Sequence, residues 1–164
     1  MGKIGNRLDL ELIVSVADAL PDVRFVFAGP ILDSDYRKPL ESAANIELLG
    51  DVHYEDIPRL LQTFDIGWVP HNVGALEVGG DVLKTYEYRA AGLVVLSTPV
   101  AGAGQRGLKE VHVVARGGQL EWIRNKIASN TRVKRVAEIF SDDHTWEGKA
   151  EGILADLELK TSSF

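Results

Sequence analysis

Short apolar runs alternate with helix-patterned segments along this chain, and this alternation most constrains its fold. The apolar runs span 24–28, 46–49, 66–69, 94–97 and 111–115. Each is too short for a helix and is rich in β-branched or aromatic residues, which is typical of buried strands. Because strands buried on both faces read as continuous apolar runs, the pattern predicts an α/β domain built on a doubly wound parallel sheet.

The segments between the runs supply the helices. The expected helices span 12–20, 55–64, 81–91 and 119–159, the last broken near 130 and at 141–143. Residues 33–44 are ambiguous because Pro39 lies among them. The first element is a helix, whereas a doubly wound domain begins with a strand that lies in the middle of its sheet. We therefore expect the first strand, which would immediately precede Gly2, to be missing.

Composition narrows the class of protein. The 164 residues fit one domain or half of a two-domain protein, and 45% hydrophobic with 26% charged residues is globular. Having no cysteine excludes disulfides, thiolate metal sites and cysteine nucleophiles. A net charge of −6 argues against a nucleic-acid partner, and no apolar run is long enough to span a membrane. With no signal-peptide pattern at the start, we expect a soluble, cytoplasmic protein.

Two familiar kinds of site find little support. The chain has one G-x-G-x-x-G, at residues 102–107, but it follows a late strand and leads into another strand rather than a helix. A mobile loop explains it better than a dinucleotide fingerprint does. His53, His71, His112 and His144 lie in four different segments without metal-ligand spacing, so we expect no metal site.

The segment 79–88 combines glycines with charged residues at the start of a helix. Gly79 and Gly80 allow close approach to a ligand, and a helix N-terminus offers N–H groups to an anion. Lys84 lies in the first turn, and Glu87, three residues on, projects from the same face. A cation for phosphate and a carboxylate for a diol suit a nucleotide. An ordinary solvated Lys–Glu pair is the alternative.

A second basic cluster opens the chain. Residues 2–7, Gly-Lys-Ile-Gly-Asn-Arg, place two cations and two glycines ahead of the first helix. A diphosphate could be held there by Lys3, Arg7 and the helix terminus. A basic surface loop explains the pattern equally well.

Five stretches, taken in order, resemble the carboxy-terminal, donor-binding half of GT-B retaining glycosyltransferases of the group 1, or family 4, type. The stretches read GKIGNRLDLELI, VRFVFAGP, NIELLGDVHYEDIPRLL, FDIGWVPH and LKTYEYRAAGLVVLSTPV. Their order and spacing extend the resemblance over nearly all of residues 2–160. The resemblance implies a Rossmann-like fold and binding of a nucleoside-diphosphate sugar.

The resemblance also implies roles for individual residues. Glu87 matches the glutamate that binds the ribose hydroxyls, and Lys84 would face the diphosphate or the sugar. Lys3 and Arg7 match the basic pair that neutralises the diphosphate. Val52 lies in the loop whose backbone reads the nucleobase in this family.

One position departs from the family pattern. Gly79 stands where the family commonly has an acidic residue, eight positions before Glu87. Asp81 or Glu77 could substitute for it, so the contacts to the transferred sugar are open.

By this resemblance, Lys84 and Arg7 would catalyse transfer of a hexosyl group electrostatically, with no metal or other cofactor. The acceptor, a glycan or a lipid-linked sugar, would bind an amino-terminal domain that this chain lacks, and the full-length enzyme could lie peripherally on a membrane. We expect the chain alone to be inactive and poorly stable, or stabilised by association. The alternatives are a non-catalytic nucleotide-binding or interaction fragment and a nucleotide-sugar epimerase-like domain.

Overall fold

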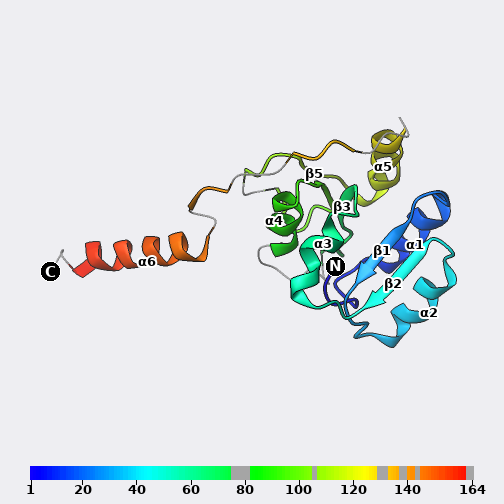
Figure 1. Cartoon of the computed structure of the whole chain (residues 1–164), viewed down its shortest axis with the longest axis horizontal. Helices are drawn as coiled ribbons and strands as arrows, with labels where there is room; N and C mark the ends of the chain where they lie inside the picture. The colour runs from blue at the N-terminus through cyan, green and yellow to red at the C-terminus, as the bar shows by residue number, and fades with distance from the viewer. Residues whose placement is uncertain (75–81, 105–106, 129–132, 137–139, 143–144, 162–164) are drawn as a thin grey trace.

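A computed structural model of the chain describes residues 1–74, 82–104, 107–128, 133–136, 140–142 and 145–161. Figure 1 shows helices and strands alternating along the chain. The strands are β1 (Phe25–Ala28), β2 (Ile46–Gly50), β3 (Ile66–Val69), β4 (Val94–Ser97) and β5 (Val111–Val113). The α-helices are α1 (Leu10–Ala19), α2 (Ser34–Ser42), α3 (Ile57–Leu61), α4 (Leu83–Ala90), α5 (Gln119–Ile127) and α6 (Trp146–Thr161). All five predicted strands are present.

All strand pairing is parallel, but the described strands form two sheets. β1 pairs with β2, and β3, β4 and β5 form a second sheet in that order. In a doubly wound fold the strand order is 3-2-1-4-5-6, so the first strand separates the second from the fourth. Since β1 and β3 stand second and fourth in that order, the break between the sheets falls at the position of the first strand.

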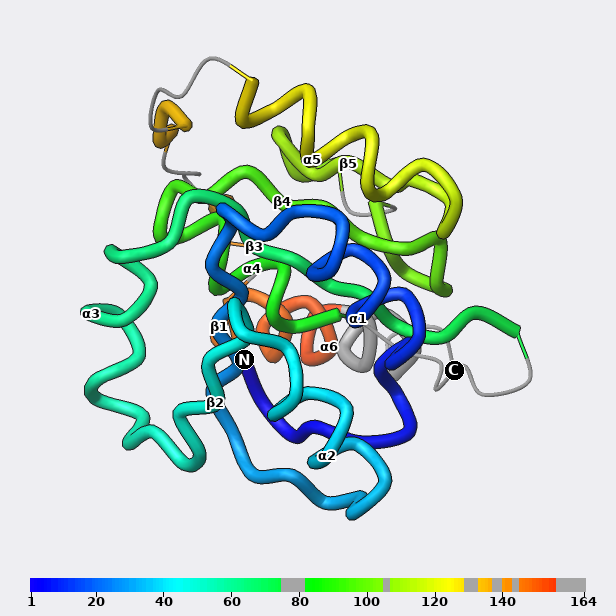
Figure 2. The backbone as a smooth tube through the Cα atoms, turned by 90° about the vertical axis from the view of Figure 1, so that its right-hand side faces the viewer, coloured from blue at the N-terminus to red at the C-terminus, as the bar shows by residue number. Residues whose placement is uncertain are grey.

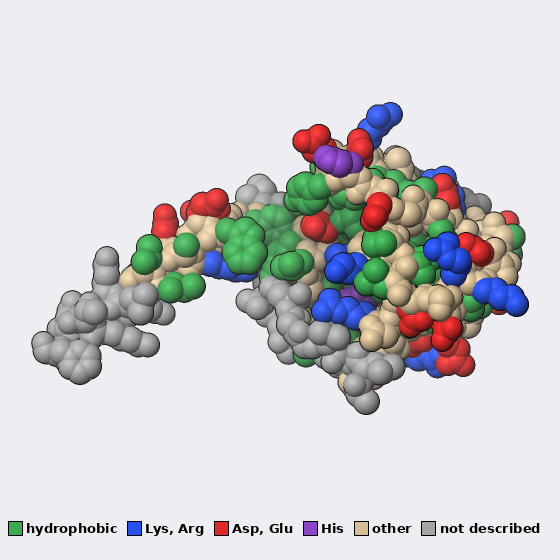
Figure 3. Space-filling model, turned by 90° about the horizontal axis from the view of Figure 1, so that it is seen from below, with side chains coloured by type: hydrophobic (Ala, Val, Ile, Leu, Met, Phe, Trp, Pro, Cys, Tyr) green, Lys and Arg blue, Asp and Glu red, His purple; other side chains and the backbone are tan. Residues whose placement is uncertain are grey.

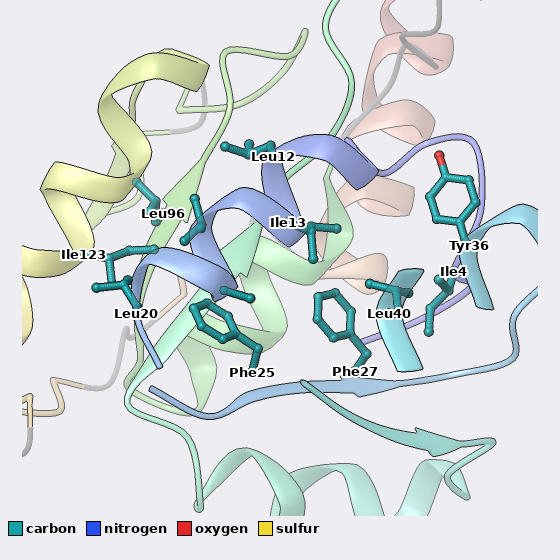
Figure 4. Packing of buried hydrophobic residues seen from close by; sticks show 12 residues of the cluster. Ile4, Leu12, Ile13, Leu20, Phe25, Phe27, Tyr36, Leu40, Leu96 and Ile123 are labelled. Atoms are coloured by element: carbon teal, nitrogen blue, oxygen red, sulfur yellow. The ribbon is translucent and has the colours of Figure 1, made fainter. Parts of the chain in front are cut away.

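The core lies mainly between α1 and the two sheets (Figure 4). Leu12, Ile13, Val16 and Ala17 line one side of α1 at helical spacing and are at most 3% exposed. They pack with aromatic residues of β1 and with Leu96 of β4. Burial of this amphipathic face therefore holds both sheets against one helix, at roughly 25 cal/mol for each Å² of apolar surface removed from water.

Several elements differ from the predicted ones. The ambiguous segment 33–44 forms α2, which Asp33 caps and which keeps Pro39 in its interior. The predicted helix 55–64 is a 3-10 turn followed by the short α3. The long helical stretch from 119 is interrupted, because residues 133–136 are not helical.

Helix α6 extends away from the rest of the molecule (Figure 1). Its exposed residues include Trp146 at 76%, Ile153 at 62% and Leu154 at 60%. Among the described helices, none is long and apolar enough to cross a lipid bilayer.

Candidate functional site

A cavity of about 930 Å³ opens where β1 and β3 end. It is lined by the amino-terminal residues 1–8, the ends of β1 and β3, the loops after them, and the start of α4. Figure 2 shows these segments, which are far apart in sequence, on the same part of the molecule. The cavity thus occupies the position that the fold predicts for a ligand, outside the carboxyl ends of parallel strands.

Backbone hydrogen bonds hold the amino-terminal loop against β1. The N–H of Gly2 donates to the carbonyl of Ala28 at 2.6 Å, and the N–H of Ile4 donates to that of Pro30 at 2.9 Å. Gly29 has a φ of +135°, and a Cβ there would overlap the carbonyl of Gly2. The Ala-Gly pair at the end of the strand therefore allows the amino-terminal backbone to lie directly alongside it.

The same loop is also fastened to the exit of β3. The N–H of Asp9 donates to the carbonyl of Pro70 at 2.8 Å, and the N–H of Asn72 donates to that of Arg7 at 2.8 Å. The side chain of Asn72 donates to the carbonyls of Asn6 at 2.8 Å and Leu8 at 3.0 Å. These bonds fix the two cations of the loop relative to β3, and sequence reasoning did not identify Asn72.

The cavity is positively charged although the protein is acidic. Its lining contains Lys3, Arg7 and Lys84, and among the described lining residues Asp33 is the only acid. The whole chain carries a net charge of −6. Figure 3 shows Lys and Arg side chains gathered beside a histidine on this face of the molecule. The local charge favours an anionic ligand.

Lys84 reaches the amino-terminal loop from α4. A Cβ placed on Gly2 would lie 2.5 Å from Lys84 Nζ, so the lysine side chain passes directly over this glycine. Gly2 also has a φ of +101°, which favours glycine. The N-cap residue of α4, Val82, makes no side-chain hydrogen bond to the start of the helix. The first N–H groups of α4, at the end nearest the cavity, therefore lack a capping side chain. The structure therefore brings the two predicted basic clusters together.

Glu87 lies one turn further along α4 and is not among the residues that line the cavity. Its Oε2 atom is buried and has no hydrogen-bond partner among the described residues. An unsatisfied buried carboxylate oxygen is costly, because it has lost its hydration without gaining a donor.

His71, which the sequence analysis set aside, lies in the cavity wall directly after β3. Burial, followed by the charges of Arg7 and Lys84, lowers the pKa of His71 from 6.5 to about 4. The side chain is therefore neutral at pH 7 and can offer one donor and one acceptor. The sequence signal that could have identified His71 is its position just after the end of a predicted strand.

The first helix is capped by protein groups rather than left open for a diphosphate. Asp9 accepts a hydrogen bond from the N–H of Leu12 at 2.9 Å. Arg116 pairs with Asp9 at 2.8 Å and with Glu11 at 2.6 Å, and these hydrogen bonds raise the pKa of Arg116. Asp9 and Glu11 therefore occupy this helix end, whereas Lys3 and Arg7 lie in the loop that precedes it.

The remaining predicted site residues either do not line the cavity or lie outside the described part of the chain. Val52 is half-buried after β2 and does not line the cavity. Asp81, Glu77 and Gly79 lie outside the described residues. In the G-x-G-x-x-G segment, residues 102–104 form a turn, and the next regular element described after the segment is the strand β5. In the described part of the chain, no group of three or more acidic or histidine side chains is placed to hold a metal ion.

Solved glycosyltransferase structures share this fold. The match with AviGT4, a glycosyltransferase involved in avilamycin A biosynthesis, covers 74% of this chain and 39% of the AviGT4 chain, with a TM-score of 0.61 and 18% identity. The match with Anabaena Alr3699/HepE, solved with UDP and glucose, covers 80% of this chain and 39% of the HepE chain, with a TM-score of 0.59 and 18% identity. The match with WaaG, a glycosyltransferase involved in lipopolysaccharide biosynthesis, covers 76% of this chain and 36% of the WaaG chain, with a TM-score of 0.58 and 18% identity. These similarities confirm the Rossmann-like α/β fold.

Sequence comparison agrees with the fold. TuaH of Bacillus subtilis (strain 168), named as a glycosyltransferase of teichuronic acid biosynthesis, is 28% identical over 101 residues, which are 60% of this chain and 25% of that protein. The chain thus spans about a quarter of that relative and less than two fifths of the solved structures. The family model described as glycosyl transferases group 1 matches residues 6–134. Since this match covers most of the sequence, the chain belongs to the group 1 glycosyl transferases.

Proposed function

We propose that this chain is the donor-binding part of a glycosyltransferase and that its cavity binds a nucleoside-diphosphate sugar. The observation that carries the proposal is a basic cavity at the strand ends of an acidic protein. Lys3, Arg7 and Lys84 supply positive charge from two segments that the fold brings together. A diphosphate is a compact anion that matches this arrangement.

Each polar group around the cavity has a part in this proposal. Lys3 and Arg7 neutralise the diphosphate from the amino-terminal loop, and Lys84 reaches it from α4. Glu87 accepts hydrogen bonds from the ribose hydroxyls, which would satisfy its buried Oε2. Neutral His71 donates one hydrogen bond to the donor without adding charge.

The nucleobase contact is the part of the proposal that the geometry revises. Val52 lies outside the cavity, whereas Leu32, Asp33 and Ser34, in the loop after β1, line it. We therefore place the base beside the loop after β1. Asp81 remains a candidate for the transferred sugar, at the position offered for it by the sequence.

In the proposed reaction, the bond between the anomeric carbon and the diphosphate oxygen breaks as the acceptor hydroxyl oxygen bonds to that carbon, and the hydroxyl proton passes to the departing diphosphate oxygen. The nucleoside diphosphate leaves as an anion, and Lys84 and Arg7 stabilise its growing negative charge. The sugar donor is the substrate, and we propose no separate cofactor. The transferred group is a hexosyl residue in this proposal.

The acceptor side lies outside this chain in the proposal. We place acceptor binding, to a glycan or a lipid-linked sugar, on a second domain, and the reaction in the cytoplasm or at its membrane surface. The fraction of the solved glycosyltransferases that the chain matches, 36–39% for the three described above, supports this division. One of those structures holds UDP and glucose, which supports the proposed class of donor.

Calorimetric titration of the folded chain with UDP, GDP and ADP tests the proposal. We expect at least one diphosphate to bind, and the corresponding monophosphate to bind at least about tenfold more weakly, because it presents less charge to the three cations. Circular dichroism and dispersed amide resonances establish that the titrated chain is folded. A folded chain that binds no diphosphate at millimolar concentration, or binds monophosphates equally well, contradicts the proposal.

A further inference from the structure

Asn72 follows the exit of β3, where it is half-buried in the wall of the charged cavity. It bonds to three successive carbonyls of the amino-terminal loop. Its side-chain amide donates to the carbonyl of Asn6 at 2.8 Å and to that of Leu8 at 3.0 Å. Its backbone N–H donates to the carbonyl of Arg7 at 2.8 Å. Both hydrogens of the amide are thus used on backbone carbonyls, so its nitrogen has no further hydrogen to donate to a ligand.

These bonds determine the backbone on both sides of Arg7. The carbonyl of Asn6 belongs to the peptide group before Arg7, and the carbonyl of Arg7 belongs to the peptide group after it. The second group is also held through the N–H of Leu8, which donates to the carbonyl of Gly5 at 2.9 Å. Because each peptide group is planar, fixing both of them fixes the φ and ψ of Arg7. The direction in which the Arg7 side chain leaves the backbone is therefore set.

Arg7 is held through its backbone more than through its side chain. The residue is exposed, and no carboxylate in the described part of the chain forms an ion pair with its guanidinium. A long side chain on a mobile backbone loses much conformational entropy when a ligand orders it. A fixed backbone reduces that loss, so the bonds from Asn72 favour binding through Arg7.

The segment that carries Asn72 is itself anchored to the core. Thr98, which is 1% exposed directly after β4, donates its hydroxyl to the carbonyl of His71 at 2.8 Å. The N–H of Thr98 donates to the carbonyl of Val69 at 3.2 Å. His71 also forms an antiparallel bridge with Leu8. Asn72 therefore holds the amino-terminal loop from a buried support.

We propose that Asn72 is a positioning residue for diphosphate binding, which holds the backbone of Arg7 so that its guanidinium is directed into the cavity. Its side-chain amide restrains the peptide group before Arg7, and its N–H restrains the group after it. Asn72 acts through Arg7 and does not contact the diphosphate. This inference rests on the proposed function above, which assigns Arg7 to the diphosphate.

Asn45 provides a matched control away from the cavity. Its side-chain amide also donates to several backbone carbonyls, those of Ala17, Leu20 and Val23, at 3.0, 2.9 and 2.9 Å around the end of α1. Asn45 is not among the residues that line the cavity. Asn45→Ala therefore removes the same kind of bond as Asn72→Ala without releasing Arg7.

A double-mutant cycle measured by calorimetry tests the proposal, with whichever of UDP, GDP and ADP binds the native chain most tightly. We expect Asn72→Ala to weaken binding about 3- to 10-fold, because Arg7 must then be ordered during binding. In the Arg7→Ala background the same change should weaken binding less than about twofold, whereas in the Lys84→Ala background it should keep its full effect. Asn45→Ala should leave the affinity within about twofold of that of the native chain, because its site is independent of the cavity.

Backbone order parameters from nitrogen relaxation test the same proposal without a ligand. The N–H of Arg7 belongs to the peptide group that the Asn72 side chain restrains. We expect its order parameter to fall from about 0.85 in the native chain to about 0.6 in Asn72→Ala. The N–H of Leu8 belongs to the next group, which keeps its bonds to Gly5 and to the backbone N–H of residue 72, so its order should be retained. Asn45→Ala should change neither value.

Three outcomes would overturn the proposal. Asn72→Ala could bind the diphosphate as tightly as the native chain does. It could weaken binding equally with and without Arg7, which would mean that Asn72 contacts the ligand itself. The order parameter of Arg7 could stay unchanged in Asn72→Ala, which would show that these bonds do not restrain it. A native chain that binds no diphosphate would instead contradict the proposed function, and the order parameters alone would then decide whether Asn72 holds Arg7.

Discussion

At the residue scale, the charged cavity depends on side chains that are remote in sequence. Lys3 and Arg7 precede α1, whereas Lys84 begins α4, and they meet only because the amino-terminal loop is bonded to the ends of both β1 and β3. Since Lys84 passes over Gly2, its ammonium group is positioned by the same loop that carries the other cations. The three cations therefore line one cavity.

Replacing a cavity cation should weaken nucleotide binding. We expect Lys84→Ala and Arg7→Ala each to weaken binding of the tightest nucleoside diphosphate roughly 10- to 100-fold, because each removes a charge-assisted contact to phosphate. Lys38→Ala is the matched control, since Lys38 is exposed on α2 and outside the cavity. Calorimetry measures all three. Equal affinities for the Lys84 and Lys38 variants would show that the cavity is not the binding site.

His71 should make the stability of the chain depend on pH. Its pKa is about 4 in the folded chain and 6.5 as a free side chain, so between these values the unfolded state binds the extra proton. The free energy of unfolding contributed by His71 is therefore complete above pH 6.5 and is lost as the pH falls towards 4. We expect about 1 kcal/mol, on the order expected for a partly exposed group screened by solvent.

His71→Gln should remove this contribution, and His53→Gln, at an exposed position, is the control. Denaturant unfolding at pH 4.5 and pH 7 measures the difference. If the pH dependence of the free energy of unfolding is unchanged in the His71 variant and changed in the His53 variant, then a group other than His71 causes it.

Sequence reasoning found the three cations but missed His71 and Asn72, and the reason is physical. A lysine near a glycine-rich helix start has a local pattern, which can be read from neighbouring residues. The role of His71 depends on burial and on charges from Arg7 and Lys84, which are distant along the chain. Asn72 likewise acts through carbonyls of Asn6 and Leu8. Contacts of this kind arise only when the tertiary fold is known.

At the scale of elements, strands were predicted better than helices. The strands lie within two residues of their predicted ends because each is an apolar run buried between layers. The segment 33–44 was ambiguous because Pro39 disfavours a helix interior, and packing of the buried Tyr36 and Leu40 overcomes that cost. Residues 133–136 had a helical pattern, but their conformation is set by tertiary hydrogen bonds.

Arg135 is the residue that makes those bonds. Its guanidinium donates to the carbonyl of Ala91 at 2.8 Å, at the end of α4, and to that of Leu61 at 2.9 Å, at the end of α3. It also donates to the carbonyls of Gln62 and Phe64. One side chain thus satisfies carbonyls at two helix ends, which have no partners within the helices.

Removing this side chain should destabilise the chain. We expect Arg135→Ala to lower the free energy of unfolding by about 1.5–3 kcal/mol, because hydrogen bonds from a charged donor are lost and their acceptors stay behind. Lys134→Ala, at the exposed neighbouring position, should stay within about 0.5 kcal/mol of the native chain. Denaturant titration followed by circular dichroism measures both. A loss below about 0.5 kcal/mol in the Arg135 variant would show that these bonds do not hold α3 and α4.

At the scale of the whole molecule, two features differ from a doubly wound domain with one continuous sheet. The described strands form two sheets rather than one, and α6 extends away from the body with exposed apolar residues. The sequence pattern predicted the parallel pairing of these strands. It did not predict the position of α6, since the packing of a terminal helix depends on what it contacts. The charged cavity is nevertheless assembled within the described chain.

The most direct test of the account is to map where a nucleoside diphosphate binds. The isotope-labelled chain is titrated with the diphosphate that calorimetry selects, and amide chemical shifts are followed along the sequence. The account predicts the largest changes at Gly5, Arg7, His71 and Lys84, which line the cavity, and little change at Lys38 on α2. Changes confined to residues outside the cavity, or none at saturating nucleotide, would contradict it.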